Sequence, residues 1–353
     1  MASNIFVNQE EGRLRAFWRI LLQGLLFFAS NILIGIPVGI VATLIAVAIT
    51  GANIMDPSAV MAIATHPVVH AAGSVAALVA MFFSYWVASR WLDRRPFRDF
   101  GFHLNSNWWA DFGFGLLLGA ILMAVIFIIE LSAGWITITG TVQSFAANSN
   151  FWIGILASLV TFICVGIYEE MLSRGYHLRN IAEGFNFGKI GPRGALLIGY
   201  LISSSIFGLL HLGNPNANWI STVNIIAAGL FIGLGYVLTR ELAMPIGVHM
   251  TWNFFQGNVF GFPVSGMTTG ASFIAIEQGG PELLTGGAFG PEAGIIGLVA
   301  MALGALLTVL WVRWRYGKAV LQDRLAIYTP KNKPAPHVAD VELAAVPQEP
   351  PAQ

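Results

Sequence analysis

Two adjacent carboxylates, Glu169 and Glu170, lie at the end of an apolar run that extends from residue 151 to residue 167. Ionisable groups inside a membrane span are costly to bury, and they indicate a functional site by default. On a helix with about 3.6 residues per turn, adjacent side chains point roughly 100° apart. Arg174 lies four residues after Glu170, so the two share a helix face and Arg174 can neutralise Glu170. Glu169 must therefore find its polar partners on other segments.

Two further motifs offer such partners. Phe207 and His211 lie four residues apart near the end of one apolar segment, and His249 and Asn253 lie four residues apart within another. Each motif also has a structural explanation. The carboxylates with their arginine can anchor a helix at the membrane interface. The first histidine can bond a loop carbonyl, and the second pair can link two helices by hydrogen bonds.

The three motifs form one site only if the helices that carry them pack side by side. We count about 1.5 Å per residue from the cytoplasmic ends of these helices. Glu169, His249 and Asn253 then come out at a similar depth, whereas His211 lies about two turns further out by the same count. The motifs therefore meet only if the fifth span begins later or the fourth extends below the membrane.

The composition is that of a polytopic membrane protein. Apolar residues make up 56% of the chain, charged residues 10%, and the mean hydropathy is +0.70. We predict an all-α membrane helix bundle, because eight stretches are long enough to cross a bilayer at about 20 residues each. These stretches are residues 20–50, 68–91, 110–133, 151–171, 195–212, 220–238, 242–260 and 293–314.

Charge and cysteine usage exclude other classes of protein. The net charge is zero, so nothing indicates a nucleic-acid partner. Cys164 is the only cysteine, which excludes an intramolecular disulfide and a cysteine-based metal cluster.

The distribution of Lys and Arg predicts the orientation of the bundle. With eight spans, all 18 Lys and Arg residues fall on the side of both termini. The loops on the opposite side, residues 51–66, 134–150, 213–219 and 261–292, contain neither. Because positive charge marks the cytoplasmic side, both termini are expected in the cytoplasm.

Three regions follow from these assignments. We expect a cytoplasmic N-terminal segment over residues 1–19 and a transmembrane bundle over residues 20–314. Residues 315–353 are expected to form a cytoplasmic, largely disordered tail, because the sequence from Pro330 onward is rich in Pro, Ala and Val and shows little periodicity.

At the three motifs the sequence closely resembles the CPBP family, the CAAX prenyl endopeptidase and bacteriocin-processing intramembrane proteases, also called the Abi family. The pattern of that family is Glu-Glu-x-x-x-Arg, then Phe-x-x-x-His, then His-x-x-x-Asn, and all three occur here in order between residues 150 and 260. The resemblance implies hydrolysis of a peptide bond within or at the membrane. It implies a peptide or membrane-protein substrate, prenylated or not, in the lipid bilayer of the bacterial cytoplasmic membrane.

The chemistry of the residues fits this activity. Glu169 is the candidate general base on water, with His211 sharing the water. His249 and Asn253 are the candidates for positioning the peptide and stabilising the oxyanion. A group of supporting residues would hold the helix face behind Glu169: Glu170, Arg174 and Phe207.

Metal dependence stays open at this stage. One Glu and two His, here Glu169, His211 and His249, can ligate zinc, but no His-Glu-x-x-His motif is present. No cofactor is therefore assigned, and direct activation of water is favoured over a zinc site.

Two other functions use the same residues. The Glu and His cluster could be the relay of a proton-coupled transporter, or the chain could be a scaffold that binds a membrane protein without cleaving it. Other protease designs fit less well, because the chain has no Gly-x-Ser-x-Gly motif and no aspartate in the middle of a span.

Overall fold

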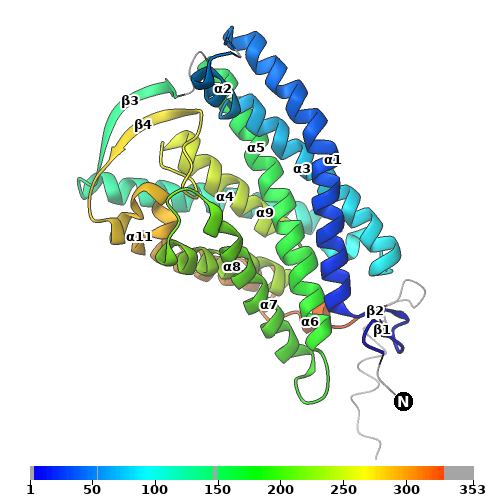
Figure 1. The fold of residues 1–353 in the computed structure, drawn as a ribbon. Helices are drawn as coiled ribbons and strands as arrows, with labels where there is room; N and C mark the ends of the chain where they lie inside the picture. The colour runs from blue at the N-terminus through cyan, green and yellow to red at the C-terminus, as the bar shows by residue number, and fades with distance from the viewer. Residues whose placement is uncertain (1–3, 54, 146–148, 330–353) are drawn as a thin grey trace, which may run out of the picture.

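The computed structural model describes residues 4–53, 55–145 and 149–329, and it is mostly helical (Figure 1). In chain order the strands and helices are β1 (Val7–Asn8), β2 (Arg13–Leu14), α1 (Ala16–Thr50), α2 (Pro57–Ala64), α3 (Pro67–Val87), α4 (Ser106–Ser132), β3 (Ile136–Ser144), α5 (Phe151–Glu170), α6 (Arg179–Phe185), α7 (Gly191–Leu210), α8 (Trp219–Thr239), α9 (Ala243–Phe254), β4 (Ala271–Gln278), α10 (Glu282–Thr285) and α11 (Ile295–Tyr316).

The expected membrane helix bundle is confirmed. Within the described part of the chain, seven helices are long and apolar enough to cross a membrane: Ala16–Thr50, Pro67–Leu92, Ser106–Ser132, Phe151–Phe185, Gly191–Gly213, Trp219–Thr239 and Ile295–Tyr316. In Figure 1, α1, α3 and α5 run side by side, and α4, α8, α9 and α11 pack at a steep inclination to them.

The eighth expected span, residues 242–260, is shorter than the others and is not among these seven helices. α9 has 12 residues and continues as the π-helical segment Phe255–Val259. It packs against α4, α5 and α8. Gly119 of α4 allows this close approach, since an added Cβ would lie only 2.6 Å from the Val248 carbonyl oxygen. A helix enclosed by protein in this way does not have to match the thickness of the bilayer.

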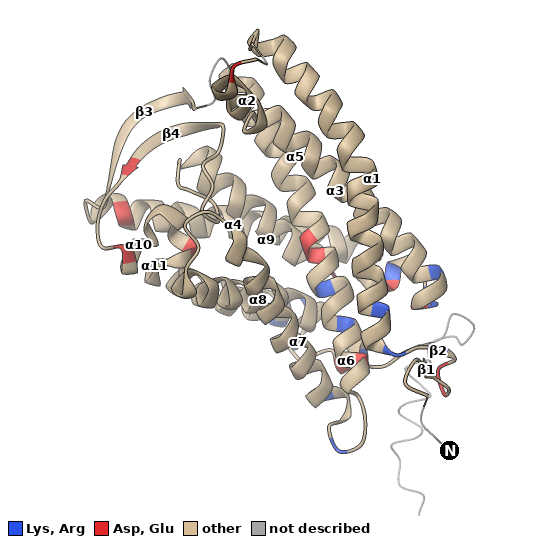
Figure 2. Ribbon diagram, in the orientation of Figure 1, with Lys and Arg blue, Asp and Glu red and all other residues tan. Residues whose placement is uncertain are grey.

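Charged residues separate along the bundle. Figure 2 shows most Lys and Arg near α6 and the β1–β2 hairpin, whereas acidic residues without basic neighbours lie near β4 and α10. This separation agrees with the sidedness read from the sequence. The location of both termini in the cytoplasm stays a prediction, because no membrane fixes the orientation.

A β-ribbon joins two of the predicted loops in this mostly helical fold. β3 lies in the 134–150 loop, and β4 lies in the 261–292 loop. The strands pair antiparallel, with Ile136 opposite Gln278 and Ser144 opposite Ala271. The four residues Ile136-Thr-Ile-Thr are all β-branched and alternate between apolar and polar, and this pattern is typical of a strand.

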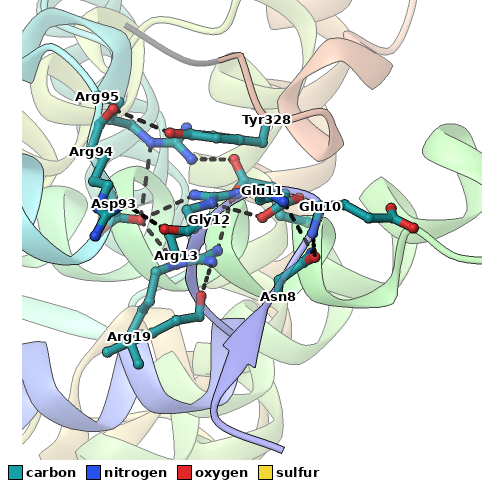
Figure 3. A network of polar contacts seen from close by, with 12 residues as sticks. Asn8, Glu10, Glu11, Gly12, Arg13, Arg19, Asp93, Arg94, Arg95 and Tyr328 are labelled. Atoms are coloured by element: carbon teal, nitrogen blue, oxygen red, sulfur yellow. Dashed lines mark hydrogen bonds and ion pairs between the residues drawn. The ribbon is translucent and has the colours of Figure 1, made fainter. Parts of the chain in front are cut away.

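A buried ion-pair network fastens the end of the bundle where the Lys and Arg gather. Figure 3 shows Arg13, Arg19 and Arg95 around Asp93. All three guanidinium groups also contact the buried carboxylate of Glu183 on α6, at 2.7, 3.0 and 2.5 Å. The network therefore joins the N-terminal hairpin, α1, the segment after α3 and α6.

The first part of the expected C-terminal tail packs on the bundle. Leu325 and Ala326 are buried in the 3₁₀-helical turn Asp323–Ala326, which contacts α6 and α7. The ring of Tyr328 lies 3.4 Å from the guanidinium carbon of Arg13. Residues 315–329 are thus structured, and the disorder expected from Pro330 onward falls outside the described residues.

Candidate active site

The helix that carries the two carboxylates continues well beyond its predicted end. α5 passes directly into the π-helical segment Met171–Leu178 and then into α6, so the helix extends without a break to Phe185. π-helical turns occur frequently at functional sites. Gly175 within this segment packs so tightly that an added Cβ would lie 2.7 Å from the Tyr85 hydroxyl oxygen. Glu169 and Glu170 therefore lie in the interior of a long helix and not at its end. The fourth span is thus longer than predicted, which is one of the two conditions under which Glu169 and His211 come to the same depth.

Glu170 is the most enclosed carboxylate of the site. It is fully buried, and its Oε1 accepts a hydrogen bond from Arg174 Nη1 at 2.8 Å. The predicted pairing of Glu170 with Arg174 is therefore present. Glu170 has a second partner that the sequence did not reveal, because its Oε1 also lies 2.8 Å from His249 Nδ1. A carboxylate at this nitrogen places the proton on Nδ1 and fixes the orientation of the ring.

Glu169 lies on the other side of the same imidazole. Its side chain is 23% exposed, and its Oε2 is 3.9 Å from His249 Nε2. Among the described residues, this oxygen has no hydrogen-bond partner although it is buried. His249 thus lies between two carboxylates. Glu170 is bonded through its Oε1 to Arg174 and to His249 itself, while its buried Oε2 has no partner among the described residues. Glu169 offers a free acceptor on the other side of the ring.

The other predicted residues meet around a cavity beside His249. His211, His249 and Asn253 all line it, together with Phe207. The Phe207 ring lies 4.8 Å from the His211 ring and 6.1 Å from the His249 ring. Its carbonyl oxygen also lies 2.8 Å from His211 Nδ1. The remaining walls are mostly apolar: Ile225, Ala228, Phe231, Ile232, Trp252 and Met301.

Comparison with known proteins identifies the segment that holds these residues. Residues 150–255 match the family described as type II CAAX prenyl endopeptidase Rce1-like. The chain contains an Rce1-like domain. This domain includes all three motifs, so the resemblance expected over residues 150–260 is confirmed.

The similarity to one curated protein extends beyond the Rce1-like domain. The chain is 25% identical to the Bacillus subtilis (strain 168) protein named "Uncharacterized protein YyaK". The match covers 261 residues, which are 71% of this chain and 80% of the relative. No solved structure matches the chain significantly.

The Rce1-like domain does not gather the ligands of a metal ion. Within residues 4–53, 55–145 and 149–329, no three His, Cys, Asp or Glu side chains are placed to hold one. The zinc alternative, with Glu169, His211 and His249 as ligands, therefore does not fit this arrangement.

The structure adds one carboxylate to the cavity that the sequence motifs did not indicate. Glu292 follows the Rce1-like domain in the chain but lines the same cavity, and it is only 3% exposed. Its Oε1 accepts a hydrogen bond from the Ser265 amide at 2.6 Å, and its Oε2 accepts one from Gln256 Nε2. Burial raises the pKa of Glu292 to about 7. The sequence feature that could have indicated Glu292 is its position immediately before the last apolar run.

We expect the Arg174→Ala variant of the full chain to be strongly destabilised. It would leave Glu170 buried without its guanidinium partner, which costs about 3–5 kcal/mol in a well-buried pair. Thermal unfolding in detergent would measure the loss. Adding Glu170→Gln should recover part of it, because Gln removes the charge and still offers an oxygen to His249. Arg193→Ala removes an exposed arginine and is the matched control. Equal instability of the single and double variants would contradict the pairing.

Proposed function

We propose that this protein is an intramembrane endopeptidase that hydrolyses a peptide bond with water activated by Glu169 and His211. The observation that carries the proposal is the unsatisfied Oε2 of Glu169 beside an imidazole held by Glu170. The match to the Rce1-like family supports a CAAX-type protease. Its substrates are peptides or membrane proteins in the lipid bilayer, and the Bacillus relative favours a bacterial cytoplasmic membrane.

The first step is the activation of water. Glu169 Oε2 takes a proton from a water molecule that His211 also bonds, and the resulting hydroxide attacks the carbonyl carbon of the substrate. The carboxyl group then returns the proton to the leaving nitrogen as the carbon–nitrogen bond breaks. A free acceptor oxygen beside His249 suits this role, because a general base must reach the proton that it removes.

The oxyanion is stabilised from the opposite helix. Asn253 Nδ2 donates to the oxygen that becomes negative in the tetrahedral intermediate. His249 lies one helical turn away on α9 and positions the peptide; as the imidazolium, with a proton on each ring nitrogen, it also donates to this oxygen from Nε2. Glu170 holds the Nδ1–H of His249, so the ring does not have to reorient during the reaction. Arg174 in turn balances Glu170, and it also donates to the Gly229 carbonyl at 2.7 Å.

Phe207 packs between Arg174 and His211. Its ring lies 4.5 Å from the guanidinium carbon of Arg174, a cation–π contact, and also packs against His211. This position shields the Glu170–Arg174 pair from the cavity and keeps the surroundings of the reacting groups apolar. Electrostatic interactions are stronger in such a medium than in water.

The proposal is tested with purified protein in liposomes. A library of quenched fluorescent peptides, half of them carrying a prenylated C-terminal CAAX sequence, should yield at least one peptide cleaved at a single bond. The prenylated and unprenylated halves decide whether a lipid group is required. Proton flux without cleavage would contradict the proposal and favour a transporter. Tight binding of a membrane protein that stays uncut would favour a scaffold.

A further inference from the structure

Glu292 is a buried carboxylate without a cation beside it. Within the described residues, its oxygens are bonded by the Ser265 amide and by the Gln256 amide, and no Lys, Arg or His forms an ion pair with it. The segment that carries Glu292, Pro291–Ala293, contacts α8, α10 and α11, and the only Lys or Arg in these helices are Arg313 and Arg315 in the last turn of α11. Burying an acid in this way is unfavourable, and the raised pKa of Glu292 reflects it. A cation that binds there would remove the penalty.

The side-chain amide of Gln256, next to Glu292, has an oxygen that lacks a donor. Gln256 Nε2 is bonded to Glu292 Oε2 and to the Pro263 carbonyl, which leaves the other atom of the amide, Oε1, pointing elsewhere. That oxygen is buried and has no hydrogen-bond partner in the described part of the chain. The amide orientation is consistent, since both neighbours of Nε2 are acceptors. Glu292 lies at the wall of the cavity, and the free oxygen belongs to the amide that bonds it.

The backbone around Glu292 is shaped to hold the carboxylate in place. Gly290 has a φ of 121°, and an added Cβ there would lie 2.6 Å from Glu292 Oε2 and 2.7 Å from Gln256 Nε2. On the other side, Asn224 Nδ2 donates to the Ala293 carbonyl at 2.6 Å. The carboxylate is therefore held between α8, the π-helical end of α9 and the segment before α11.

We propose that Glu292 and Gln256 form a specificity subsite that binds a cationic group of the substrate, the ammonium of a lysine or free amino terminus or the guanidinium of an arginine. The subsite rests on the proposed peptidase function, because Glu292 lines the same cavity as His211, His249 and Asn253. Both cations are rich in donors, and a carboxylate at the wall of a protease pocket selects basic side chains in this way. The cation gains the Glu292 charge and the free Gln256 oxygen together.

The decisive experiment compares two peptides that differ at one residue, Lys or Nε-acetyl-lysine, scanned along a sequence that the protein cleaves. At one position the wild type should favour Lys by about 10-fold to 100-fold in kcat/KM, the range of a charge-assisted hydrogen bond. Glu292→Gln should abolish this preference and leave cleavage of the acetylated peptide unchanged. Glu292→Asp should keep the preference, and Gln256→Met should reduce it. Glu282→Gln, at an exposed acid of the same segment, should change nothing.

Two results would overturn the subsite. The first is equal cleavage of the Lys and acetyl-lysine peptides at every position by the wild type. The second is an equal loss of both activities in Glu292→Gln, which would make the residue a structural support. If no peptide is cleaved, the peptidase proposal fails, and fluorescence anisotropy with the same labelled peptides tests the subsite separately. A Lys preference in binding that Glu292→Gln removes would then support the subsite, and equal binding would overturn it.

Discussion

Peptide cleavage is expected to fall by about 10²–10⁴-fold in Glu169→Gln and in His211→Ala, the usual cost of removing a general base or its partner on water. Glutamine keeps the size of Glu169 but cannot take up the proton. Asn253→Ala should lower kcat by about 10²–10³-fold, the effect of losing one oxyanion donor. Its KM should change little, because that contact forms in the transition state.

The measurement requires variants that are folded. Each variant should elute as a single species in detergent and unfold at the wild-type temperature, as is expected for Glu169 because its side chain is partly exposed. Glu277→Gln, at an exposed acid in β4, is the matched control and should cleave at the wild-type rate. Wild-type cleavage by Glu169→Gln would contradict the mechanism. Loss of activity with a chelator and its return with zinc would contradict metal-free activation of water.

The largest loss of stability is expected for Glu183→Gln. This carboxylate contacts Arg13, Arg19 and Arg95, and all four side chains are buried. Without it, the acids left beside these arginines are Asp93, at 3.3 to 4.0 Å from them, and Glu11, at 2.7 Å from Arg13. Breaking one buried pair costs about 3–5 kcal/mol. A carboxylate shared by four arginines, with Arg179 Nε at 3.5 Å as the fourth, should reach at least that range. Thermal unfolding in detergent would measure the effect.

A second substitution separates charge from packing in this network. Glu183→Gln combined with Arg95→Met removes one cation along with the carboxylate, so part of the lost stability should return. Glu10→Gln removes an exposed acid near the network and should have a small effect. A Glu183→Gln variant as stable as the Glu10→Gln control would mean that the arginines are satisfied without Glu183.

Local spacing predicted the contacts that depend on one helix. The four-residue separation of Glu170 and Arg174 produced the ion pair that the structure contains. The apolar runs gave seven spans to within a few residues at most ends. The sequence also grouped His211, His249 and Asn253, which line one cavity. These successes share a cause, since hydrophobic and polar periodicity along a helix is encoded within a few neighbouring residues.

Contacts between distant segments could not be read in the same way. The bond between His249 and Glu170 depends on how α9 packs against α5, which glycines on neighbouring helices allow. Glu292 reaches the cavity through a loop whose path is set by its pairing with Gln256 and Ser265. The β-ribbon joins strands more than 120 residues apart. The ribbon has one local signal in the sequence, the run of β-branched residues that begins at Ile136.

The π-helical segment Met171–Leu178 determines in which direction the side chains before and after it point. Glu170 points into the candidate active site at one end of this segment, and Glu183 points into the arginine network beyond the other. Each residue of an α-helix advances the azimuth by roughly 100°. Deleting one residue between the two acids would therefore swing one of them out of its surroundings. The wider turns of the π-helix thus set the angle between the directions in which Glu170 and Glu183 point. One continuous helix can therefore place an acid in each of two buried polar clusters on different sides.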